Sequence, residues 1–523
     1  MKREFPVAVA AALGLAALLL HPALYGLGEV LPGEARAYGQ AWGAWSLFHE
    51  AEVAGEVVLA GWPVLVTIAL LDLLLPLAVA TTLAVWAWLA AGLAAVYLCA
   101  RSRDAPLPGA LAAALVAGAN PALLQGVHEG RYEWLVVPWV ALALFQKRPL
   151  WTMVGLLGAA AHSPLFGLVT ALLAATVAVT VSYKRAGATL AAGGLCAGLA
   201  ALPYRELRRL PVEEQSLEAF ANAGDLLEPF YSWRPDAAAP GIALWLALAG
   251  AAWLLAKRRL DVALAVAALL GIVLALGPEL WWGRTGFRLH ERPVPLPAAL
   301  IEAMLPSLPT LTWKAAMVPA MVAAGLLLGP LRRPGFGVAA LVLGFALSRS
   351  LPTSDASIPR SVEQLADGDA PVLHLPVATD SHNLRLLWFQ TAHARPLFTG
   401  MGPLEASELL ADPLVVLALN ATAQEPRYAV PDRYPRTILM TLGVREVLLH
   451  RDGAELGGLV LLDQLLGGQL GSPQRDLVGE VDVYRIPAGH GGEEPLAVPV
   501  QEPGDPPEGW LAPERWLETY GGG

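Results

Sequence analysis

Long apolar stretches constrain this chain more than any other feature. A helix that crosses the core of a bilayer needs about 20 apolar residues, and the first two thirds of the sequence hold a series of such stretches separated by polar links. A composition with 55% hydrophobic and 15% charged residues is also far from that of an ordinary soluble protein. The sequence therefore predicts an α-helical polytopic membrane protein with about 11 transmembrane helices, in the runs 5–26, 64–100, 107–124, 134–146, 150–163, 165–183, 187–203, 241–256, 260–278, 313–330 and 335–350.

Two of these runs can be interpreted in more than one way. The run 64–100 is long enough to be one span preceded by an interfacial helix, in which case Asp72 is solvated. The run from Leu150 to Tyr183 makes two spans only if His162, Ser163 and Pro164 form a turn. Proline disfavours helical backbone in the residue before it, which favours the turn.

The basic residues of the short links predict the orientation, because Lys and Arg accumulate on the cytoplasmic side. With the N-terminus inside, every basic cluster of the eleven-span arrangement falls on one face: Lys2–Arg3, Arg101 with Arg103, Lys147–Arg148, Lys184–Arg185, Lys257–Arg259 and Arg332–Arg333. We therefore expect a protein of the cytoplasmic (inner) membrane whose connections 27–63, 125–133, 204–240 and 279–312 are external. The C-terminal part then lies on the same external side.

Charge and residue pattern separate that C-terminal part from the rest. Residues 1–350 hold 24 Lys and Arg against 21 Asp and Glu, whereas residues 351–523 hold 11 against 24. Short β-like runs near 371–376, 446–450 and 481–486 alternate with helical segments such as 405–420, which predicts a small external α/β domain at 351–487. The remainder, 488–523, is rich in Gly, Pro and Glu and is expected to be a flexible tail.

Several classes of function are excluded or unsupported. The net charge of −10 leaves no basic surplus for nucleic acid. The sequence contains no P-loop or dinucleotide-binding fingerprint, so an ATP-driven pump is unsupported. No cofactor is identified with certainty, although a divalent cation is possible. Cys99 and Cys196 both lie in apolar runs, without the spacing of a metal site or redox pair.

Acidic residues concentrate in two external connections. A carboxylate of the first connection, between 27 and 63, suits a general base that acts on a substrate arriving along the bilayer. His128, Glu129 and Glu133 form a cluster that suits a divalent cation or the positioning of an acceptor hydroxyl, with His162 on the same face as a further candidate. For the carboxylate of the first connection, the alternative is a solvated loop acid. For the cluster it is an ordinary polar turn between two spans, and for His162 it is a capping or packing residue.

External cations are rarer and run against the positive-inside trend. Arginine forms paired hydrogen bonds with phosphate, so these residues are candidates for binding the phosphate of a lipid carrier. The alternative is that they snorkel to lipid headgroups. The candidates are Arg205, Arg208, Arg209, Arg284 and Arg288.

Several loose motifs occur in a fixed order along the chain. In the membrane part they are the acidic first connection around Glu34 and Trp42, Gly126–Gly130 leading to Pro138, the turn at His162–Pro164, and Val294–Pro297 followed by Leu305–Pro306. In the external domain they are the segments 372–376, 390–396, 443–448 and 483–485. The order of these motifs resembles bacterial multi-pass members of the glycosyltransferase C (GT-C) superfamily. The chain departs from the superfamily in carrying Glu where the first connection usually has Asp, and Leu311–Lys314 where arginines are usual.

The resemblance implies transfer of a sugar from a polyprenyl-phosphate carrier to a glycan, lipid or protein acceptor on the external (periplasmic) face. By position, Glu34 is the implied base, with Glu29 as the weaker candidate. The rival hypotheses are a non-catalytic membrane protein that transports or assembles lipid-linked polymers and a scaffold with an external binding domain.

Overall fold

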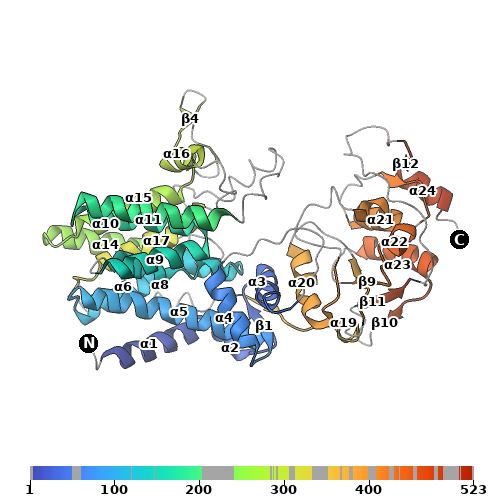
Figure 1. Ribbon diagram of the computed structural model, residues 1–523, viewed down its shortest axis with the longest axis horizontal. Coiled ribbons are helices and arrows are strands. Elements are labelled where there is room, and N and C mark those ends of the chain that lie inside the picture. The colour runs from blue at the N-terminus through green and yellow to red at the C-terminus, as the bar shows by residue number, and fades with distance from the viewer. Residues whose placement is uncertain are drawn as a thin grey trace. The chain divides into compact units, whose positions relative to one another are not determined.

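The computed structural model describes most of the chain as two compact units (Figure 1). Unit 1 comprises residues 1–40 and 59–355, and unit 2 comprises residues 41–58 and 356–523. The described residues are 4–49, 61–118, 120–145, 148–202, 241–304 without 283, 284, 287, 290 and 291, 313–332, 352–365, 368–375, 381–397, 408–422, 429–451 without 435, 456–475, 481–486, 506 and 508–520.

Unit 1 is built from helices. In chain order they are α1 (Glu4–Leu19), α2 (His21–Tyr25), α3 (Arg36–Trp45, which continues into unit 2), α4 (Trp62–Asp72), α5 (Leu77–Ser102), α6 (Leu107–Gly118), α7 (Pro121–His128), η1 (Tyr132–Trp134), α8 (Val137–Phe145), α9 (Pro149–His162), α10 (Pro164–Val179), α11 (Tyr183–Ala201), α14 (Gly241–Ala256), α15 (Val262–Ala275), α16 (Pro297–Met304), η3 (Trp313–Ala316) and α17 (Met317–Leu327).

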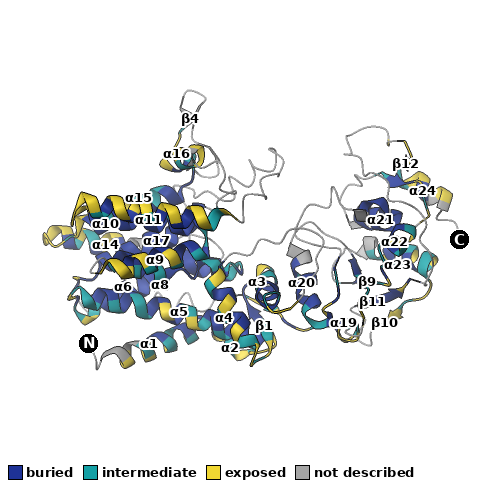
Figure 2. Ribbon diagram, viewed as in Figure 1, coloured by how far each residue is buried: buried dark blue, intermediate teal, exposed yellow. Residues whose placement is uncertain are grey.

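Helix α17 lies at the centre of this unit. All of its residues are buried, and it packs against α6 and α15. Glycine makes the α6–α17 contact close, because a Cβ at Gly325 would lie 2.7 Å from the carbonyl oxygen of Ala113. The outward faces of α11 and α15 are exposed although their residues are apolar, as Figure 2 shows in yellow. Leu195, Leu199, Val262 and Leu269 lie on these faces.

Local sequence explains where two of these helices begin. The expected turn between α9 and α10 is confirmed: α9 ends at His162, and the Ser163 hydroxyl caps α10 by accepting a hydrogen bond from the Leu165 N–H. Asp261 caps α15 in the same way, since its carboxylate accepts from the N–H groups of Ala263 and Leu264. Pro164 at the first position of α10 costs no hydrogen bond there.

The expected number of spans stays a prediction. Among the described helices, α5 alone is long and apolar enough to cross a membrane, and α6 with α7, bent by 40° at a short break, would make a second. The other apolar helices have 10–17 residues. The long run 64–100 is divided into α4 and α5, and the expected last span, 335–350, lies outside the described residues.

Short strands complete unit 1. Strand β1 (Val30–Pro32) pairs antiparallel with β6 (Thr353–Asp355), so that Val30 lies opposite Asp355. Two further antiparallel pairs are formed by β2 (Trp281–Trp282) with β3 (Thr285–Gly286), and by β4 (Arg288–Leu289) with β5 (Arg292–Pro293).

Unit 2 contains a four-stranded sheet in the order β10-β11-β9-β7. Its strands are β7 (Val372–Leu375), β9 (Glu446–His450), β10 (Gln474–Arg475) and β11 (Val481–Arg485), with β7 parallel to β9 and the other pairs antiparallel. A second pair joins β8 (Val430–Pro431) to β12 (Trp510–Leu511). The helices are α19 (Arg360–Glu363), α20 (Ser381–His393), η5 (Glu408–Ala411), α21 (Pro413–Thr422), α22 (Thr437–Thr441), α23 (Leu456–Leu470) and α24 (Pro513–Tyr520).

The sheet of unit 2 has a different layer on each face. Alternate strand residues such as Leu373, Val447 and Leu449 share one apolar core with residues of α21 and α23. The opposite residues, His374 and His450, lie on the face that contacts α20 through ring contacts with Phe389. The predicted β-runs near 371–376, 446–450 and 481–486 all form strands of this sheet.

The chain is divided differently from the expected boundaries. Residues 353–355, expected in the external domain, form β6 in unit 1. Residues 41–58 belong to unit 2, where Trp42 donates a buried hydrogen bond of 2.7 Å to Gln390. The described residues of the expected flexible tail instead form β12 and α24, because Trp516 is completely buried and donates to the Arg433 carbonyl.

Candidate functional site

Two glycines bring the first connection against the loop after α7. Gly33 has φ +106° and Gly130 has φ +72°, a region that side chains rarely adopt. A Cβ at Gly33 would lie 2.4 Å from the Val127 carbonyl oxygen, and a Cβ at Gly130 would lie 2.2 Å from the Ala37 nitrogen. Only glycine permits this approach of the two backbones.

Hydrogen bonds from distant parts of the chain fix the first connection in place. The Gly33 N–H donates to the Pro352 carbonyl at 2.9 Å, and the Ser354 hydroxyl donates to the Gly33 carbonyl at 2.8 Å. The Tyr132 hydroxyl donates to the Pro32 carbonyl at 2.7 Å. Pro32 and Gly33, which directly precede Glu34, are therefore held by two separate segments of the chain.

Glu34 and His128 form a pair at this junction. The Glu34 N–H donates to the His128 carbonyl at 2.7 Å, and the Glu34 carboxylate lies 3.1 Å from His128 Nε2. The Glu34 side chain is 57% exposed, whereas that of His128 is 16% exposed. A mostly buried imidazole thus orients a carboxylate that solvent or a substrate can still reach.

Glu129 is held in a different way. Its carboxylate lies 2.7 Å from Arg131 Nε and accepts a hydrogen bond of 3.0 Å from the amide nitrogen of Gln125. These two contacts hold the Glu129 carboxylate beside the Glu34–His128 pair.

Glu133 is half-buried between α3 and the α9–α10 turn. Its carboxylate accepts a long hydrogen bond of 3.4 Å from Gln40, and its carbonyl lies 3.0 Å from His162 Nδ1. Desolvation raises the pKa of the Glu133 carboxyl above its usual value, against the opposing attraction of Arg131 and Arg36. Because the carbonyl of Glu133 can only accept, His162 Nδ1 carries the proton.

The structure brings together four of the predicted residues and places others elsewhere. Glu34, His128, Glu129 and Glu133 lie around one loop junction, with His162 behind Glu133. Glu29 is exposed in the turn before β1. Arg205, Arg208, Arg209 and Arg284 lie outside the described residues, and Arg288 is described only by its backbone in β4.

Three contributors to the site were not among the residues predicted from the sequence. Gln40 and Gln125 bind two of the glutamates, and the segment 352–355 braces the first connection. Glutamines carry no charge or spacing signal that marks them, although Gln125 precedes Glu129 by one helical turn. In the part of the chain that the structure describes, no three His, Cys, Asp or Glu residues are placed to hold a metal ion.

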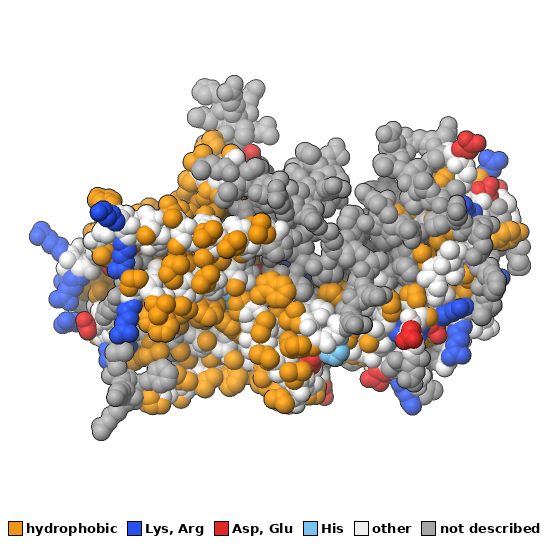
Figure 3. Space-filling view, viewed as in Figure 1, with side chains coloured by type: hydrophobic (Ala, Val, Ile, Leu, Met, Phe, Trp, Pro, Cys, Tyr) orange, Lys and Arg blue, Asp and Glu red, His pale blue; other side chains and the backbone are white. Residues whose placement is uncertain are grey.

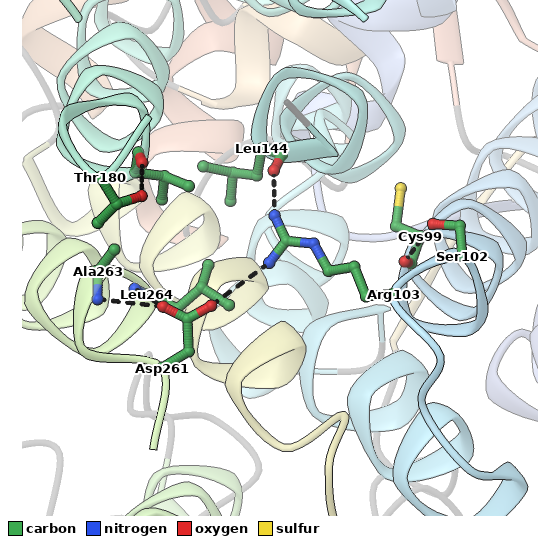
Figure 4. A network of polar contacts seen from close by, with 9 residues as sticks. Cys99, Ser102, Arg103, Leu144, Thr180, Asp261, Ala263 and Leu264 are labelled. Carbon is green, nitrogen blue, oxygen red and sulfur yellow. Dashed lines mark hydrogen bonds and ion pairs between the residues drawn. The ribbon is translucent and has the colours of Figure 1, made fainter. Parts of the chain in front are cut away.

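Basic residues gather at the other end of the same helices. Arg103, after α5, donates to the Leu144 carbonyl at the end of α8 and lies 3.9 Å from the Asp261 carboxylate at the start of α15 (Figure 4). Helix α8 begins next to Glu133 and ends at Phe145, so the acidic cluster and Arg103 lie at opposite ends of it. Figure 3 shows Lys and Arg side chains collected at one end of unit 1, beside a largely hydrophobic surface.

Comparison with known proteins gives a fold. No protein-family model matches the chain, and no curated protein sequence matches it. Two solved structures of the arabinofuranosyltransferase AftD from mycobacteria, one of them of a mutant, match 94% of this chain with TM-scores of 0.52 and 0.51. The chain is similar in fold to AftD.

The likeness to AftD is one of fold, since the sequence identity is 15% in both comparisons. The chain also spans only 42% and 40% of the length of the two AftD chains.

Proposed function

We propose that this chain is a membrane glycosyltransferase that moves a sugar from a polyprenyl-phosphate carrier to an acceptor hydroxyl on the external face of the cytoplasmic membrane. The observation that carries the proposal is the Glu34–His128 pair, a reachable carboxylate held in one orientation within a fold similar to that of AftD. The acceptor is a glycan, a lipid or a protein.

Glu34 acts as the general base. Its carboxylate takes the proton of the acceptor hydroxyl while the acceptor oxygen forms a bond with the anomeric carbon of the sugar. The bond between that carbon and the phosphate oxygen breaks, and the polyprenyl phosphate leaves. His128 Nε2, 3.1 Å from the Glu34 carboxylate, donates a hydrogen bond that fixes the orientation of the carboxylate.

The neighbouring residues position the substrates. Glu129, held by Arg131 and Gln125, accepts a hydrogen bond from an acceptor hydroxyl. Glu133, whose pKa is raised, offers a carboxyl that is more easily protonated and therefore able to donate one. In this proposal Arg205, Arg208, Arg209, Arg284 and Arg288 bind the carrier phosphate, because guanidinium groups pair with phosphate oxygens.

The test replaces Glu34 with Gln in a strain that lacks the native gene. Mass spectrometry of surface glycans and of polyprenyl-linked sugars should show loss of a glycan and accumulation of its lipid-linked donor. General-base catalysis contributes about 10²–10⁴-fold, so transfer should fall by that factor. The same change at Glu29 separates the two candidate bases and should leave transfer near the wild-type rate. An unchanged glycan in Glu34→Gln would contradict the assignment.

A further inference from the structure

His162 lies where three segments of unit 1 meet. It ends α9, and its side chain is completely buried. Its Nδ1–H donates to the Glu133 carbonyl at 3.0 Å, and its own carbonyl accepts a hydrogen bond of 2.9 Å from the N–H of Gly61, directly before α4. This residue thus joins the loop after α7 to the start of α4 and to the α9–α10 turn.

A glycine closes the third side of this junction. Gly61 has φ +80°, and a Cβ there would lie 3.0 Å from the Glu133 Cα. The Gly61 backbone therefore packs on that of Glu133 while its N–H reaches the His162 carbonyl. Because each of the three residues contacts the other two, a shift of one backbone disturbs both of the others.

The second ring nitrogen of His162 plays no part in these contacts. Nε2 is buried and makes no hydrogen bond in the part of the chain that the structure describes. The Trp88 ring of α5 meets the histidine ring edge-on at 5.4 Å, but the one N–H of that indole donates to the Thr67 hydroxyl of α4. A completely buried ring is also out of reach of an acceptor or a metal ion, which leaves Nδ1 as the nitrogen that acts.

The loop after α7 is held at both of its ends. At one end the backbones of Gly130 and Ala37 touch. At the other end the His162 ring binds the Glu133 carbonyl. Loss of the Nδ1–H removes the side-chain hydrogen bond at this second end, so the Glu133 carboxylate loses its fixed position in the acidic cluster.

We propose that His162 is a positioning residue that acts only through its Nδ1–H, which fixes the loop of Glu133 and with it the carboxylate that positions the acceptor. The inference rests on the proposed function for the role of Glu133. A shift of about 1 Å caused far from the reacting atoms lowers a rate by up to about 10²-fold. Loss of this hydrogen bond should therefore be visible in transfer.

Two variants of similar size test the hydrogen bond in the strain that lacks the native gene. His162→Asn places an amide N–H near the position of Nδ1, whereas His162→Leu fills about the same volume without a donor. Mass spectrometry of surface glycans and polyprenyl-linked sugars should show transfer lowered by about tenfold to a hundredfold in His162→Leu and close to the wild type in His162→Asn. Packing against Trp88 alone predicts equal transfer in both variants, and this result would overturn the proposal.

A third variant tests the other nitrogen. His162→Gln offers an amide near the position of Nε2 and should behave like His162→Leu. Full transfer in His162→Gln together with loss in His162→Asn would assign the role to Nε2 and overturn the proposal. The control is His21→Leu, at an exposed histidine of unit 1, which should leave transfer unchanged.

Hydrogen exchange of the full chain in detergent shows whether the effect is local. Peptides covering 131–137 should exchange faster in His162→Leu than in His162→Asn, whereas peptides from α15 should exchange alike in both. Equally faster exchange at α15 in His162→Leu would attribute the lost transfer to general destabilisation and overturn the positioning role.

Glu34→Gln separates this inference from the proposed function. If Glu34→Gln loses the glycan while His162→Asn and His162→Leu are alike, the positioning role alone fails. If Glu34→Gln keeps the glycan, the proposed function fails.

The wild-type protein decides if the His162 variants do not fold. His162 is the only histidine followed by serine in the sequence, so isotopic labelling of histidine and of the serine nitrogen selects its signals in solid-state NMR of the chain in lipid. The ring nitrogen shifts should show a proton on Nδ1. A ring without a proton on Nδ1 would overturn the proposal.

Discussion

At the scale of single residues, the site depends on positions where no side chain fits. Gly33 and Gly130 let two loops touch through their backbones, and this contact places the Glu34 N–H on the His128 carbonyl. The charged residues were visible in the sequence as clusters, but the glycines that unite them were only parts of loose motifs. Chemistry at this site therefore rests on backbone conformation as much as on carboxylates.

Replacing Gly33 with Ala should separate the two loops. The new Cβ meets the Val127 carbonyl at 2.4 Å and the backbone has φ +106°, so the change should cost on the order of 1–3 kcal/mol and reduce transfer as strongly as Glu34→Gln. The control is Gly14→Ala in α1, where nothing lies within 4 Å of the new Cβ. Thermal unfolding and the glycan assay measure the two effects. Equal behaviour of both variants would show that the backbone contact is dispensable.

At the scale of elements, local pattern predicted helices and strands well but not their assembly. Proline and polar breaks predict the α9–α10 turn and the division of the run 64–100, and short β-like runs predict the strands β7, β9 and β11. Helix α24 was not predicted, because Gly and Pro are abundant in the segment 488–523 and made the whole segment look like a flexible tail. Burial of one aromatic residue, Trp516, outweighs that local signal.

Trp516→Ala should loosen the C-terminal segment and destabilise unit 2. Removing a fully buried tryptophan costs about 3–5 kcal/mol, and the hydrogen bond to the Arg433 carbonyl is lost as well. Urea-dependent hydrogen exchange of peptides from β9 reports the free energy of unfolding of unit 2. Glu518→Ala on the exposed side of α24 should change it by less than about 0.5 kcal/mol. A loss below about 1 kcal/mol in Trp516→Ala would mean that α24 is not part of the core.

At the scale of the whole molecule, charge distribution predicts which side faces the cytoplasm. The basic residues around Arg103 and the acidic cluster around Glu34 lie at opposite ends of the helices of unit 1, as the positive-inside trend requires. The orientation itself is tested with single cysteines. Cys99 and Cys196 are both buried, so replacing them with Ala gives a background free of thiols.

An impermeant maleimide applied to intact cells should label a cysteine at position 514 but not one at position 259. Glu514→Cys tests the external placement of the C-terminal part, and Arg259→Cys tests the cytoplasmic placement of the link after α14; both native side chains are exposed. Permeabilised cells provide the control, in which both variants should react. Labelling of Arg259→Cys alone in intact cells would reverse the proposed orientation and place Glu34 on the cytoplasmic face.

The sequence by itself determined that the first part of the chain is helical and apolar and that a separate α/β part follows. It also determined that acidic and basic residues occupy different links between the apolar runs. These properties follow from composition and from patterns within about 20 residues, because the hydrophobic effect and helical periodicity act on neighbouring residues. It also placed Glu34, His128, Glu129 and Glu133 among the candidates. His128, Glu129 and Glu133 were selected as a cluster of charge, whereas Glu34 was selected by its position in the resemblance to the GT-C superfamily.

Only the tertiary structure decided how these candidates are used. Glu34 and His128 are far apart in sequence, and the strand that braces them comes from residues 353–355. The same holds for Gly61, Glu133 and His162, which no spacing rule connects. Long-range contacts of this kind depend on which surfaces pack together, and packing is a property of the whole unit that local patterns do not contain.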